Sequence, residues 1–140
     1  MCMTHINRAA PCPTGLVHAW HDAVNRGDAE TAAGLCGPNV RVGGPRGGSG
    51  GRDAVRAWVG QAGVHLVPLR TWSVPGTTTT VVVEQQASWP GRPEPGAGEA
   101  RRAASVFRVT DAGISAILRF ADLPGALADA GLPADAPADE

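Results

Sequence analysis

The pattern of hydrophobic positions changes from a helical to an alternating period near Val64. Before this point apolar residues recur every three or four positions in residues 14–27, 29–36 and 51–61, a spacing typical of amphipathic helices. After it, apolar and polar residues alternate in runs at residues 65–74, 77–89, 101–109 and 114–121, as they do in half-buried strands. Residues 122–132 return to a helical pattern.

Turn signals separate the strand runs: Pro75-Gly76, the proline- and glycine-rich residues 90–99, and Asp111-Ala112-Gly113. Helices followed by a run of strands are typical of an α+β domain, in which about three N-terminal helices cover a curved antiparallel sheet and enclose a pocket. The chain of 140 residues suffices for one such core. We expect the domain to span residues 14–132, with disordered tails at residues 1–13 and 133–140.

The first helix is bounded by an N-cap candidate, Thr14, and by Gly27. Its apolar stripe consists of Leu16, Val17, Trp20, Ala23 and Val24. The polar positions outside that stripe are His18, His21, Asp22 and Asn25. We expect these four side chains to form a solvated face.

Composition excludes several classes of partner. A formal charge of -1 gives no basic field, and four Trp, two Phe and no Tyr leave few rings for stacking bases, so we expect no nucleic-acid partner. No apolar stretch approaches the roughly 20 residues of a bilayer span, and the N-terminal residues lack an apolar leader region. We therefore expect a cytoplasmic protein without a membrane partner.

The metal-binding residue types lack a metal-binding pattern. The three cysteines, Cys2, Cys12 and Cys36, are odd in number and are expected to be free thiols. Cys2 and Cys12 with His5 lack a fourth ligand, and the pair His18 and His21 lacks a third. We predict neither a metal nor a cofactor.

The glycine-rich segment Gly43–Gly51 lies between residues 39–42, which predict a short strand, and the predicted helix at 51–61, a place where phosphate loops occur. A Walker-type loop requires a lysine, and the chain contains none. A dinucleotide fingerprint requires parallel strands in a βαβ unit, which the later meander does not supply. The sequence leaves the role of this segment open.

Three stretches carry a family resemblance: residues 24–42, residues 51–59 and residues 111–132. They share Gly27-Asp28 between the first helices, Pro38-Asn39 before the first strand, Gly51-Arg52 at the third helix, and Phe120-x-Asp122 after the last strand. In these features the chain resembles the SnoaL-like branch of the nuclear transport factor 2-like superfamily. The resemblance implies a cone-shaped roll with an apolar cavity, often as a homodimer.

The best-understood enzymes of this superfamily are ketosteroid isomerases. They place a tyrosine, a base carboxylate and a hydrogen-bonding aspartate where this chain has Trp20, Gly44 and Ser105. Epoxide hydrolases on the fold use an acid-Arg-acid set with tyrosine, but the only Arg-x-Asp here, Arg26 to Asp28, lies at a helix junction. Neither standard chemistry is therefore expected, because glycine cannot take a proton and an indole only donates.

Strand alternation, anchored on an inward Ser105, predicts the cavity lining. The predicted lining residues are Trp20, Trp58, Val83, Gln85, Ser105, Phe107, Ile117 and Arg119. Glu84 then points away. Arg119 either faces the cavity with Asp122 as its nearest partner or lies at solvent, since a shift of one residue reverses its face. Asp122 is a candidate acid if it is buried, and otherwise the N-cap of the last helix.

These observations favour a domain that binds a small, mainly apolar molecule of polycyclic or aromatic type, as a homodimer. The first alternative is a cofactor-independent cyclase or isomerase of the SnoaL type, with Arg119 polarising a carbonyl and Asp122 or a water moving protons. The second is a dimeric interaction module with a closed core, which uses the outer sheet positions Thr80, Val82, Glu84 and Gln86.

Overall fold

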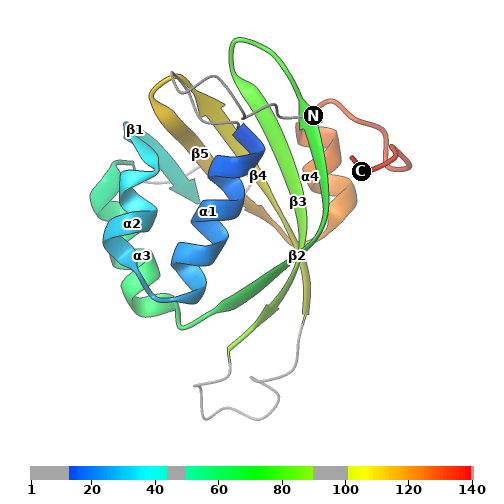
Figure 1. Ribbon diagram of the computed structural model, residues 1–140. Helices are drawn as coiled ribbons and strands as arrows, with labels where there is room; N and C mark the ends of the chain where they lie inside the picture. The colour runs from blue at the N-terminus through cyan, green and yellow to red at the C-terminus, as the bar shows by residue number, and fades with distance from the viewer. Residues whose placement is uncertain (1–12, 44–49, 90–100, 140) are drawn as a thin grey trace.

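The structure, a computed structural model, describes residues 13–43, 50–89 and 101–139. Within these residues the helices are α1 (Pro13–Asn25), α2 (Ala29–Gly34), α3 (Arg52–Ala62) and α4 (Leu123–Asp129). The strands are β1 (Cys36–Gly43), β2 (His65–Val74), β3 (Thr79–Ser88), β4 (Arg101–Thr110) and β5 (Gly113–Phe120). Helices α1 to α3 lie on one side of a strongly curved sheet and α4 lies on the other (Figure 1). This arrangement confirms the predicted α+β class.

The five-stranded sheet has the order β1-β5-β4-β3-β2. Strands β2 to β5 form the predicted antiparallel meander. Strand β1 differs from the prediction, because it pairs with β5 in parallel, with Val42 opposite Ile117. Turn residues in the sequence indicate only which consecutive strands pair as hairpins. Strand β1 has no hairpin partner, since the chain leaves it for α3 and returns to the sheet at the opposite edge.

The helical layer packs on the inner face of the sheet, the face covered by α1 to α3. Val17 and Val24 of α1 and Val55 and Val59 of α3 are buried in one core with Phe107 of β4. Helix α2 begins after an N-cap, Asp28, whose carboxylate accepts a hydrogen bond from the Thr31 backbone N–H at 3.1 Å. Burial of these aliphatic faces is the main force that holds the helices on the sheet.

The outer face of the sheet carries a second core, formed against α4. Trp72, Val82, Val106 and Leu118 contribute from four adjacent strands, and Leu127 packs on them from α4. The sequence predicts a final helix but not its side of the sheet. Both faces of the central strands β3 and β4 are consequently buried.

The last described residues continue from α4 along β2, the edge strand. The Trp72 indole Nε1 donates to the Ala136 carbonyl at 2.9 Å, and the Asp139 N–H donates to the Thr71 carbonyl at 2.7 Å. The sequence predicts a disordered tail for residues 133–140, whereas the structure gives residues 133–139 defined contacts with the sheet. Residues 1–12 of the other predicted tail lie outside the described residues.

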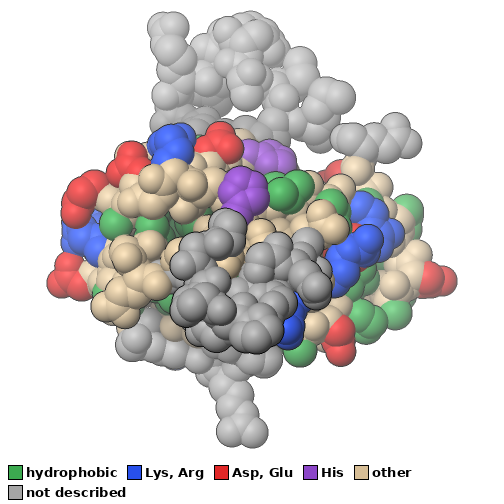
Figure 2. Space-filling model, turned by 90° about the horizontal axis from the view of Figure 1, so that it is seen from below, with side chains coloured by type: hydrophobic (Ala, Val, Ile, Leu, Met, Phe, Trp, Pro, Cys, Tyr) green, Lys and Arg blue, Asp and Glu red, His purple; other side chains and the backbone are tan. Residues whose placement is uncertain are grey.

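Two further sequence expectations concern the surface. No helix within the described residues has the length and apolar character needed to cross a bilayer. Figure 2 shows one face of the molecule, where acidic and basic side chains lie close to one another. That mixture agrees with the net charge of -1 and contains no extended field of one sign in this view.

Gly113 is the backbone position at which β5 meets the end of α2, and it provides a stability test. Its φ is +116°, and an added Cβ would lie 2.7 Å from the Leu35 carbonyl oxygen. Gly131 has a φ of +79° with open space around it. We expect Gly131→Ala to lower the free energy of unfolding by about 1 kcal/mol through backbone strain alone, and Gly113→Ala to lower it by roughly 2 kcal/mol more.

Urea unfolding of both variants measures this difference directly. Equal losses in the two variants would show that the close approach of β5 to Leu35 is not a packing constraint.

Candidate functional site

A cavity of about 340 Å³ lies between the helical layer and the inner face of the sheet. Helices α1 and α3 provide two tryptophans, and strands β1 to β5 provide most of the remaining wall. The lining residues are Trp20, Val42, Trp58, Val64, Leu66, Gln85, Ala87, Trp89, Ala103, Ala104, Ser105, Ile117, Arg119, Phe120 and Ala121. Most of this wall is apolar, with small alanines on the strands facing large rings from the helices.

Aromatic rings form one wall of the cavity. Trp20 stacks on Trp58 with ring centroids 5.8 Å apart and planes 10° from parallel. Phe107 meets Trp20 edge to face at 5.2 Å, so the Trp20 ring packs against two aromatic neighbours. Both tryptophans line the cavity.

A chain of hydrogen bonds links α1 to the sheet beside the cavity. His21 Nδ1 lies 2.8 Å from the Val17 carbonyl oxygen, and His21 Nε2 lies 2.7 Å from Gln85 Nε2. Ser105 Oγ donates to Gln85 Oε1 at 2.9 Å. The Val17 carbonyl only accepts, so Nδ1 of the neutral ring carries the proton and Nε2 accepts from the Gln85 amide. The chain of donors therefore leaves Ser105 Oγ with acceptor capacity.

Burial sets the charge of His21, whose side chain is 1% exposed. Loss of hydration disfavours the imidazolium and lowers the pKa of His21 to about 4, and the hydrogen bond to Val17 offsets only part of this effect. The ring is consequently neutral at physiological pH. With its Nε2 lone pair engaged by Gln85, it is poorly suited to act as a base.

Arg119 of β5 provides the charged group of the cavity wall. Its guanidinium carbon lies 5.4 Å from the centre of the Trp58 ring, a cation–π contact. The side chain is exposed as well as lining the cavity, so it stands at the opening. The register of β5, with Arg119 opposite Ser105, places it on the inner face.

The buried indole of Trp20 has one unmet hydrogen bond. Trp20 is 3% exposed and lines the cavity, and its Nε1 has no acceptor among the described residues. A buried donor without a partner costs free energy, and because this atom has almost no accessible surface it is not a contact point for a ligand in the cavity as described.

A protein-family profile for the SnoaL-like domain matches residues 17–117. The chain belongs to the SnoaL-like domain family. This finding confirms the resemblance seen in the sequence. No curated protein matches the sequence of this SnoaL-like domain.

Solved structures share the fold at low sequence identity. An NTF2-like protein of unknown function from Cytophaga hutchinsonii aligns with a TM-score of 0.66 and 15% identity over 83% of this chain and 95% of that chain. A candidate polyketide cyclase from Xanthomonas campestris pv. campestris aligns with a TM-score of 0.59 and 19% sequence identity. The alignment covers 79% of this chain and 90% of that chain. The Orange Carotenoid Protein of Anabaena (Nostoc) sp. PCC 7120, binding canthaxanthin, aligns with a TM-score of 0.66 and 19% sequence identity. The alignment covers 85% of this chain and 39% of that chain.

The structure brings most of the predicted site residues of the SnoaL-like domain together. Trp20, Trp58, Gln85, Ser105, Ile117 and Arg119 line the cavity. Val83 and Phe107 share their face of the sheet but lie in the core beneath the lining. Whether these residues bind a ligand remains a prediction.

Asp122 lies apart from the cavity lining. Its carboxylate accepts from the Gly125 N–H at 2.9 Å and caps α4, which is the second of the two roles expected for it. Among the described residues it forms no ion pair with Arg119, whose guanidinium lies over Trp58 instead. Gly44, which stands at the position of the isomerase base, lies outside the described residues.

The expectation of a solvated face on α1 was wrong for His21 and Asn25. His21 is buried, and Asn25 exchanges hydrogen bonds of 2.8 Å and 2.7 Å with the backbone of Leu66. Val17, Trp20, His21 and Val24 have the i, i+3, i+4, i+7 spacing of one helical face, and this was the signal that placed His21 inside. The sequence analysis also missed Trp89, which lines the cavity just after the end of β3 and packs against the inner core. Phe120 borders the cavity, but its ring packs against the outer core beside α4.

The lowered pKa of His21 predicts an acid-sensitive stability. The unfolded chain binds a proton near the ordinary pKa of 6.5 and the native protein near 4, so the native state loses stability as the pH falls through this window and keeps it above. Between pH 7 and pH 5 the free energy of unfolding is expected to fall by about 2 kcal/mol.

Urea titrations at both pH values test this prediction, with His21→Gln as the matched variant. The variant is expected to lack this part of the pH dependence. Equal pH dependence in the two proteins would contradict a neutral, buried His21.

Proposed function

We propose that this SnoaL-like domain binds a planar, mainly apolar small molecule of aromatic type in the cavity between α1, α3 and the sheet. The observation that supports the proposal best is the ordered stack of Trp20 and Trp58 beside an open, mostly apolar volume. Rigid aromatic walls with a few fixed polar groups are the usual form of a small-molecule site.

The size of the cavity favours a compact ligand. Its volume of about 340 Å³ lies near the lower end of the range of about 300–1,000 Å³ found for ligand pockets. Small alanines at positions 87 and 103 keep this volume open, whereas larger aliphatic residues would fill it. A molecule of two or three fused rings suits these dimensions better than an extended one.

The polar groups of the cavity favour binding over the cyclase alternative. Its described lining contains no aspartate or glutamate that could act as a proton-transfer base. The neutral His21 lies behind Gln85, and both of its ring nitrogens are engaged. Arg119 is able to orient or polarise a carbonyl group without moving a proton.

The interaction-module alternative is weakened by α4. Val82 and Glu84 of the outer sheet face are buried, and Val82 packs in the core that includes Leu127 of α4. A homodimer, which remains part of our proposal, would therefore have to form through other surfaces of the domain.

Titration with 2-acetonaphthone, a neutral two-ring ketone, tests the proposed function by calorimetry and tryptophan fluorescence. We expect saturable binding that Ala87→Phe abolishes, because the added ring occupies the cavity volume. Trp58→Ala is expected to weaken binding about tenfold through the loss of an aromatic contact.

Trp72→Phe is the matched control, because Trp72 belongs to the core on the opposite face of the sheet. This variant should bind the ketone as the wild type does. Saturable binding that survives Ala87→Phe would place the ligand elsewhere and would contradict the proposal. Product formation on a carbonyl-containing ligand would favour the cyclase instead.

A further inference from the structure

Among the described residues, no carboxylate balances the charge of Arg119. Within the described part of the chain, the arginines at ion-pair distance from a carboxylate are Arg26, Arg56, Arg70, Arg102 and Arg108. Arg119 has no carboxylate at that distance among the described residues. It is also the only ionisable residue in the described cavity lining.

The contact with Trp58 leaves the hydrogen-bonding edge of Arg119 available. The guanidinium carbon lies 5.4 Å from the centre of the Trp58 ring, and among the described residues no acceptor is bonded to its five N–H donors. The cation–π contact therefore holds the side chain at the opening without satisfying its donors. A restrained guanidinium of this kind matches the two oxygens of a carboxylate.

The indole of Trp20 contributes its aromatic ring to the same cavity wall and is stacked on the ring that Arg119 contacts. Its Nε1 is buried without an acceptor in the described residues and has almost no accessible surface, so this atom is not a donor open to the cavity. The N–H donors of Arg119 therefore set the preference, which is for a ligand with acceptor oxygens.

We propose that the ligand is an aromatic anion, a planar ring system whose carboxylate accepts hydrogen bonds from Arg119 while its rings lie beside Trp20 and Trp58. This inference rests on the proposed function and narrows its ligand class. Aromatic walls also suit cations, but the positive charge of Arg119 and the lack of a carboxylate in the described lining disfavour them.

Three probes with the same rings and different charges test the inference: 2-naphthoate, the neutral 2-acetonaphthone and the cationic 2-naphthylmethylammonium. In calorimetric titrations at pH 7 we expect the wild type to bind 2-naphthoate at least about tenfold more tightly than the ketone, and the ammonium most weakly. The preference for 2-naphthoate should decrease with added salt, because the guanidinium is partly exposed.

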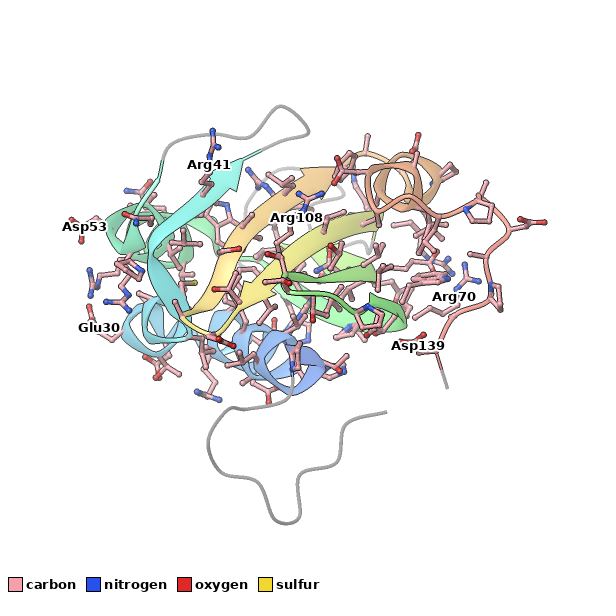
Figure 3. The ribbon with its side chains drawn as sticks, turned by 90° about the horizontal axis from the view of Figure 1, so that it is seen from above. Glu30, Arg41, Asp53, Arg70, Arg108 and Asp139 are labelled. Carbon is pink, nitrogen blue, oxygen red and sulfur yellow. The ribbon has the colours of Figure 1, made fainter. Side chains whose placement is uncertain are left out.

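Arg119→Gln is the test variant and Arg41→Gln is its control. Arg41 is an exposed arginine of β1 that points away from the sheet, outside the cavity lining (Figure 3). Both substitutions remove one positive charge, so only a local role of Arg119 separates them. We expect Arg119→Gln to abolish the preference for 2-naphthoate over the ketone, and Arg41→Gln to retain the preference.

The outcomes separate this inference from the proposed function. Equal binding of the anion and the ketone, a preference that survives Arg119→Gln, or tighter binding of the ammonium would overturn the anion proposal and leave aromatic binding intact. Failure of all three probes to bind the folded wild type would contradict both proposals. Circular dichroism and thermal unfolding confirm that each variant is folded before binding is compared.

Discussion

Burial of both faces of β3 and β4 is the constraint on which the rest of the structure depends. Every polar side chain on these strands that points into a core must find a partner, since an unpaired buried polar group is costly. On the outer face Glu84 meets this requirement with Arg70 and Arg102, at 2.7 Å and 3.1 Å. The hydrogen bond from Arg70 is the main reason that the pKa of Glu84 is lowered. On the inner face Gln85 and Ser105 meet the requirement through His21.

The inner arrangement joins stability to the proposed binding site. His21 fixes α1 on the sheet through Gln85, and the same helix carries Trp20 into the cavity wall one residue earlier. A neutral imidazole is needed for this direction of hydrogen bonding, because an imidazolium would present a second donor to the Gln85 amide. The protonation state of one buried side chain therefore controls the polarity of the cavity wall at Ser105.

The sequence predicts the sheet part of the site more closely than the helical part. Alternation with a period of two places Gln85, Ser105 and Arg119 on one face once a single inward residue is chosen. Helix faces have diffuse borders, and His21 at such a border was assigned to solvent because of its polarity. The parallel pairing of β1 and the side of the sheet covered by α4 depend on long-range packing, for which neither element carries a local signal.

The position of α4 has a consequence for the order in which the chain folds during synthesis. The sheet can form once β5 has left the ribosome, but Val82, Val106 and Leu118 on its outer face remain uncovered until residues 123–139 follow. A nascent chain paused between these points exposes aliphatic surface and the open edge of β2, both of which promote aggregation. The last described residues thus provide the cover that ends this vulnerable interval.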